Sequence, residues 1–160
     1  MKRITRIQIV LLSAIAALLT GCNSFNRQWN ELGEYPVQYT DATGRWEGTW
    51  SCEQTGHSGQ LWCMVSQVEP ERYELFFRAE WAKIFRGNYT LYVTPKQAEG
   101  SGESDHSDHA DGTLHFKGET KIAGFLGGMY TFDGTITPTR FETDYTGPGN
   151  EGVFVLERPE

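Results

Sequence analysis

The chain has 160 residues and a formal net charge of −7, with 13% aromatic residues, 18 glycines and three methionines. This length corresponds to one domain. The negative charge argues against a nucleic-acid partner, because nucleic-acid-binding surfaces are basic. Many aromatic residues and glycines with few methionines are typical of short strands and tight turns rather than of a helical bundle.

The first 21 residues have the pattern of a signal peptide. Basic residues lie within Met1–Arg6, and the apolar stretch Ile7–Leu19 that follows is short for a membrane span. Removing this segment takes away three basic residues and no acidic one, so the net charge changes from −7 to −10.

The segment Leu19-Thr20-Gly21-Cys22 resembles the lipobox of bacterial lipoproteins. The resemblance implies cleavage before Cys22, a diacylglycerol on the Cys22 thiol, an acyl chain such as palmitate on the new amine, and anchoring in the membrane of the cell envelope. Each buried methylene contributes about 0.8 kcal/mol, so several chains anchor firmly. Asn23 stands where the inner-membrane retention signal usually has Asp, which favours the outer membrane, on its periplasmic face or at the cell surface. The alternative is a plain secretory signal followed by an incidental cysteine.

Residues 22–43 are expected to be the lipidated cysteine and a tether. They are rich in Asn, Ser, Gly and Pro and have no sustained apolar period. The apolar residues of this segment are compatible with a short strand or a flap over the domain, and they are Trp29, Leu32, Tyr35, Val37 and Tyr39.

Residues 44–158 are predicted to form one all-β domain of about eight strands. Apolar residues alternate with polar ones, most clearly in Tyr73–Trp81, as in half-buried antiparallel strands. The connections are too short for crossover helices, so the strands follow one another in up-and-down order. The simplest architecture is a small barrel, and the alternative is a two-layer sandwich. Inward Gly48, Gly118 and Gly134 suit strands that bend to close a barrel.

Two cysteines, Cys52 and Cys63, remain in the domain. If the first hairpin turns at the two-residue loop His57-Ser58, these cysteines face each other on the same side of the sheet. In an oxidising compartment we expect a structural disulfide that contributes about 2–3 kcal/mol. A redox or metal-binding pair is less favoured, because the CxxC spacing is absent.

Two segments contain residue types that are used in catalysis or in metal binding. Gly56-His57-Ser58-Gly59 matches the esterase nucleophile elbow only in part, because Gln60 replaces its last glycine and the segment joins two strands. We therefore predict no catalytic residue, no enzymatic activity and no cofactor.

His106 and His109 lie among carboxylates in the loop 99–111, which suits zinc, nickel or copper. A solvated acidic loop is the favoured interpretation, because ordering a Gly/Ser-rich loop costs entropy, so no metal ligand is assigned.

Aromatic side chains dominate the predicted inner face. In a barrel of eight strands they either fill the interior or line a pocket for one small ligand. The candidate ligand-lining residues are Trp46, Trp50, Tyr73, Phe77, Trp81, Phe116, Tyr130 and Phe132.

Two resemblances concern function. Gly44-Arg45-Trp46 is similar to the G-x-W motif of lipocalins, some of which are bacterial lipoproteins that carry hydrophobic ligands. The segments Trp46–Trp50 and Thr55–Leu61 resemble small exported bacterial proteins and lipoproteins without an assigned activity. We expect a membrane-anchored envelope lipoprotein whose domain is a non-catalytic binding module for an envelope protein. The alternative is a lipocalin-like carrier of a small apolar ligand.

Overall fold

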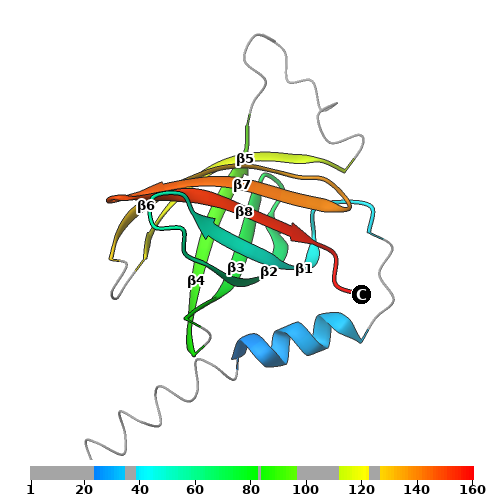
Figure 1. The fold of residues 1–160 in the computed structure, drawn as a ribbon. Coiled ribbons are helices and arrows are strands. Elements are labelled where there is room, and N and C mark those ends of the chain that lie inside the picture. Colours follow the sequence, from blue (N-terminus) through cyan, green and yellow to red (C-terminus); the bar gives the residue numbers. More distant parts are fainter. Residues whose placement is uncertain (1–23, 35–38, 83, 97–111, 123–126) are drawn as a thin grey trace, which may run out of the picture. The chain divides into compact units, whose positions relative to one another are not determined.

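The computed structural model describes residues 24–34, 39–82, 84–96, 112–122 and 127–160. Eight antiparallel strands form one closed barrel in sequence order (Figure 1). The strands are β1 Gly44–Cys52, β2 Ser58–Glu69, β3 Arg72–Trp81, β4 Phe85–Pro95, β5 Leu114–Ile122, β6 Gly128–Ile136, β7 Arg140–Gly147 and β8 Asn150–Glu157. The predicted up-and-down barrel is confirmed, and the chain does not form the two-layer sandwich.

The alternation of apolar and polar residues determines which side chains face inward. In β7, Phe141, Thr143 and Tyr145 are buried, whereas the residues between them are exposed. The sheet closes where β1 pairs with β8, from Glu47↔Glu157 to Cys52↔Gly152. At this seam a side chain on Gly48 would overlap the backbone of Val155, so only glycine permits the two strands to approach.

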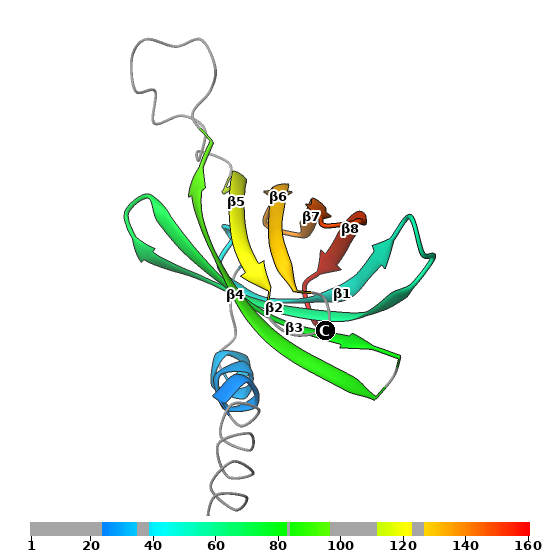
Figure 2. The same ribbon diagram turned by 90° about the vertical axis from the view of Figure 1, so that its left-hand side faces the viewer.

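The ladder between β4 and β5 is much shorter than the others. Its pairs are Thr94↔Lys117 and Pro95↔Phe116, at the end of β4 and near the start of β5 (Figure 2). Further along, the Thr120 hydroxyl donates a hydrogen bond to the Thr90 carbonyl oxygen at 3.1 Å. At this seam the barrel is therefore closed by two backbone pairs at one end and by a side-chain hydrogen bond towards the other.

The chain divides into two units, Met1–Tyr35 and Pro36–Glu160. In the first, residues 24–33 are helical, where the sequence predicts a tether with a short strand or a flap as the alternative. Stacking of Phe25 on Trp29 and an Arg27–Glu31 ion pair, both one helical turn apart, favour this helix. No helix in the described ranges is long and apolar enough to cross a membrane. Cys22 and the signal segment lie outside the described residues.

The predicted disulfide between Cys52 and Cys63 is wrong, because the first hairpin turns at a different place. Cys52 donates its backbone N–H to the His57 carbonyl at 2.8 Å, and Gly56 in the intervening loop has φ +66°. Cys63 consequently pairs with Trp46, six residues along β1 from Cys52. At about 3.3 Å per residue the cysteines are about 20 Å apart along the sheet, beyond the roughly 7 Å that a disulfide allows between Cα atoms. Both thiols are free and buried.

Candidate functional site

One half of the barrel interior is filled by large side chains. Phe141 lies at its centre and contacts the rings of Trp46, Phe77 and Phe116, with ring centroids 5.8–6.2 Å apart. These four residues are at most 1% exposed. Leucines from β3, β4, β5 and β8 complete this core. These rings contact one another and are closed off from solvent.

Arg158 closes this end of the barrel. Its guanidinium lies 3.6 Å from the ring of Trp46 and 4.2 Å from the ring of Tyr39. It donates hydrogen bonds to the carbonyl oxygens of Pro138 at 2.8 Å and Thr43 at 2.7 Å, among others. Burial lowers the pKa of Arg158 to about 10, so the group remains charged at neutral pH. A charged side chain thus joins the segment before β1, the β6–β7 turn and the C-terminus.

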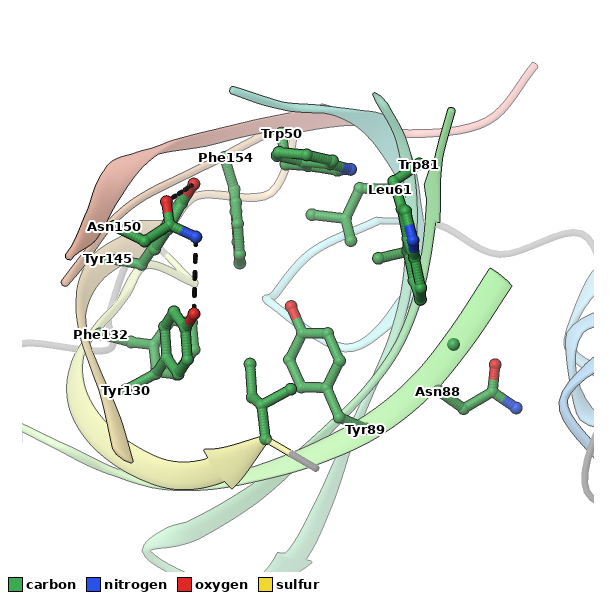
Figure 3. A pocket seen from close by; sticks show the side chains of 13 residues that line it. Trp50, Leu61, Trp81, Asn88, Tyr89, Tyr130, Phe132, Tyr145, Asn150 and Phe154 are labelled. Carbon is green, nitrogen blue, oxygen red and sulfur yellow. Dashed lines mark hydrogen bonds between the residues drawn. The ribbon is translucent and has the colours of Figure 1, made fainter. Parts of the chain in front are cut away.

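The other half of the interior contains a cavity of about 250 Å³ (Figure 3). Its walls come from the last residues of β1, β3, β5 and β7 and the first residues of β2, β4, β6 and β8. It therefore lies at the barrel end with the β1–β2, β3–β4, β5–β6 and β7–β8 turns. The lining residues are Trp50, Leu61, Ala79, Trp81, Gly87, Asn88, Tyr89, Ile122, Tyr130, Phe132, Tyr145, Asn150 and Phe154.

Glycines on the inner face explain why aromatic residues leave this end open. Trp50 pairs with Gly59, and its indole N–H passes beside that glycine to donate a hydrogen bond to the Glu80 carbonyl at 2.9 Å. A Cβ atom at Gly87 would lie 3.0 Å from the Trp81 ring, and one at Gly147 would overlap the Tyr130 ring. The large rings therefore lie flat over neighbouring strands that carry no side chain at those points. They form walls instead of filling the centre.

The cavity is apolar except for a few neutral polar groups. On one wall the Tyr145 hydroxyl donates to the Ser51 carbonyl at 3.1 Å and lies 3.4 Å from Asn150 Oδ1, while Asn150 Nδ2 lies 3.5 Å from the Tyr130 hydroxyl. Tyr89 points its hydroxyl into the cavity from another wall (Figure 3). Burial raises the pKa values of Tyr89 and Tyr145, so both hydroxyls are protonated donors at neutral pH.

The predicted ligand-lining residues divide into two groups. The cavity wall contains Trp50, Trp81, Tyr130 and Phe132. The remaining four lie outside it, because Trp46, Phe77 and Phe116 belong to the filled core and Tyr73 packs against that core from β3.

Four lining residues of the cavity were not predicted from the sequence: Tyr89, Tyr145, Asn150 and Phe154. The alternating pattern places Tyr89, Tyr145 and Phe154 inward but does not show at which end of the barrel each one lies. Asn150 lies directly after the β7–β8 turn and resembles an ordinary turn residue in the sequence.

A second hollow, on the outer face of β5, β6 and β7, is polar. Asp133 lies in its floor, pairs with Lys96, and lies 3.3 Å from the Lys117 ammonium group. The hydrogen bond from Lys96 is the main reason that the pKa of Asp133 is lowered. Because Asp133 is already paired with both lysines, we assign no ligand to this surface.

The candidate metal loop with His106 and His109 lies outside the described residues, and the described ranges contain no cluster suited to a metal ion. Ser58 is exposed at the start of β2. No model of a known protein family matches this sequence, and no curated protein matches it.

Proposed function

We propose that this chain is a lipid-anchored protein of the bacterial cell envelope whose barrel binds a small apolar molecule without chemically changing it. The observation that carries the proposal is the cavity, which is lined mostly by aromatic and aliphatic side chains. Concave, mostly apolar sites with a few polar groups are typical of small-molecule binding. The cavity favours the carrier alternative over a module that recognises only another protein.

The size of the cavity limits the ligand. A protein cavity of about 150 Å³ accommodates benzene, and sites for drug-sized molecules start at about 300 Å³. A cavity of about 250 Å³ at the open end of the barrel therefore suits a compact molecule of one or two rings, or a short branched chain. A long acyl chain would extend out of the barrel.

The turn between β3 and β4 supports delivery of an apolar ligand from an apolar phase. Ile84 is 77% exposed and Phe85 is 54% exposed. Phe85 stacks on Trp81, a residue of the cavity wall, with ring centroids 6.3 Å apart. Apolar surface thus continues from the cavity to the rim, and a lipid anchor on Cys22 would hold such a barrel close to a bilayer.

Binding in the cavity is tested with naphthalene, by titrating the purified domain into an aqueous naphthalene solution and measuring heat. We expect binding by the wild type and at least about tenfold weaker binding by Ala79→Leu, because the added methylenes occupy the cavity. Thr131→Leu is the matched control, since Thr131 is exposed and lies between two wall residues of β6. The proposal is refuted if the wild type does not bind, or if Ala79→Leu binds as tightly as the control.

The anchor is tested by metabolic labelling with palmitate and by membrane fractionation. Cys22→Ala is expected to remove the label and to leave an unprocessed precursor, whereas Cys52→Ala keeps the label and normal processing. Normal labelling of the Cys22→Ala protein would exclude lipidation at this residue.

A further inference from the structure

The polar groups of the cavity have unused hydrogen-bonding capacity. No described residue forms a hydrogen bond with the Tyr89 hydroxyl, which points into the open space (Figure 3). On another wall, the contacts of Asn150 with the Tyr130 and Tyr145 hydroxyls are long, at 3.5 and 3.4 Å. Long hydrogen bonds are weak, so the amide of Asn150 can turn towards a ligand at little cost.

The described residues that line the cavity carry no charge. None of them is Asp, Glu, Lys, Arg or His. An ion in an apolar site loses its hydration, and the loss is offset only by an opposite charge or by several hydrogen bonds. The negative net charge of the whole chain further disfavours an anion.

We propose that the ligand is an uncharged apolar molecule with one carbonyl, amide or hydroxyl group, which the Tyr89 hydroxyl recognises. This inference rests on the proposed function and narrows its ligand class. It excludes free fatty acids and other carboxylates as preferred ligands, and it also excludes quaternary ammonium compounds. Aromatic faces attract such cations, but no carboxylate among the described lining residues neutralises them.

Matched probes separate charge from hydrogen bonding. The compounds 2-naphthamide and 2-naphthoate have nearly the same shape, and at pH 7 only the second is charged. The second pair tests hydrogen bonding: the ketone 2-acetonaphthone has a carbonyl oxygen where its hydrocarbon isostere, 2-isopropenylnaphthalene, has a terminal methylene group. We expect calorimetry to show naphthoate binding at least about 30-fold more weakly than naphthamide, because its carboxylate is buried without a cation. We expect the ketone to bind about three- to tenfold more tightly than its hydrocarbon isostere, as one neutral hydrogen bond predicts.

Tyr89→Phe removes the hydroxyl and keeps the ring, so it should abolish the preference for the ketone over its hydrocarbon isostere. Tyr92→Phe is the control, because Tyr92 is exposed on the same strand and its hydroxyl donates to Glu74. Equal affinities of naphthamide and naphthoate, equally tight binding of 2-naphthylmethyl-trimethylammonium, or a ketone preference that persists in Tyr89→Phe would overturn this inference while leaving binding in the cavity intact. Failure of every naphthalene compound to bind would instead overturn the proposed function itself.

Discussion

Arg158 offers a direct test of how the filled end of the barrel is held together. Its guanidinium lies between the rings of Tyr39 and Trp46 and donates hydrogen bonds to carbonyls of two separate segments, the residues before β1 and the β6–β7 turn. Arg158→Ala removes all of these contacts together. Arg158→Lys keeps the charge but replaces the planar, multiply donating group by a single ammonium.

The expected size of the effect follows from these contacts. A cation–π contact contributes about 0.5–2 kcal/mol, and a hydrogen bond from a charged donor about 1.5–3 kcal/mol. Contacts that share one side chain are not additive, so we expect Arg158→Ala to lower the free energy of unfolding by about 3 kcal/mol. With an unfolding entropy of about 2.1 cal/mol/K per residue and roughly 125 residues in Pro36–Glu160, the melting temperature falls by about 11 °C. Arg158→Lys should lower the melting temperature by about 4–8 °C, since it loses part of the network.

Thermal unfolding followed by circular dichroism measures both variants. Arg140→Ala is the control, because Arg140 lies at the start of β7 and its ion pairs with Glu142 and Glu157 are exposed. Exposed ion pairs contribute little to stability, so this variant should melt within about 2 °C of the wild type. If Arg158→Ala melts as close to the wild type as Arg140→Ala does, Arg158 does not hold the end of the barrel. If Arg158→Lys matches the wild type, charge alone is sufficient and the planar group is not required.

Three further predictions concern the cysteines and the β1–β8 seam. Peptide mapping without reductant should find Cys52 and Cys63 as free thiols, and a disulfide between them would contradict the β1–β2 register. Burial raises the pKa of the Cys63 thiol in the folded protein. As pH rises above about 9, this thiol therefore loses its proton in the unfolded chain but keeps it in the folded protein. The free energy of unfolding then falls by up to about 1.4 kcal/mol per pH unit. In a Cys52→Ala background, urea unfolding at pH 9 and 10 should show that the free energy of unfolding decreases less between these pH values when Cys63 is also replaced by Ala. Equal decreases with and without Cys63 would show that its thiol does not cause the pH dependence. Gly48→Ala should destabilise the barrel by about 2–3 kcal/mol in the same assay, because its methyl group would overlap the Val155 backbone, and Thr49→Ala should have little effect.

The barrel could be predicted from the sequence because its signals are local. A period of two residues identifies strands and their inner face, and short connections between most of the strands exclude crossover helices there. The same pattern does not determine register. A shift of six residues in the pairing of β1 with β2 leaves every side chain on its predicted face, so alternation could not detect the error in the hairpin. The predicted disulfide depended on register and was therefore wrong, although both cysteines do face inward.

The position of the loop, not its composition, was the source of that error. Both Gly56 and Gly59 are compatible with a turn, and the prediction placed the turn between them. In the structure only Gly56 adopts a left-handed conformation. Gly59 instead belongs to β2, where it provides space for Trp50 and for the backbone of β3. A glycine can serve a turn or a close approach, and only the three-dimensional neighbours distinguish the two.

The same distinction explains how one continuous inner face forms a core at one end and a cavity at the other. At the filled end, inward positions carry Leu, Phe and Trp, and Arg158 covers them. At the open end, inward positions near the turns include Gly59, Gly87 and Gly147, each beside a large ring that lies over it. The glycines remove side-chain volume where the aromatic residues would otherwise meet at the centre. Alternating aromatic residues alone therefore do not distinguish a filled barrel from a hollow one, and an inward glycine paired with an aromatic residue does not do so either, because Gly134 pairs with Phe116 in the filled core.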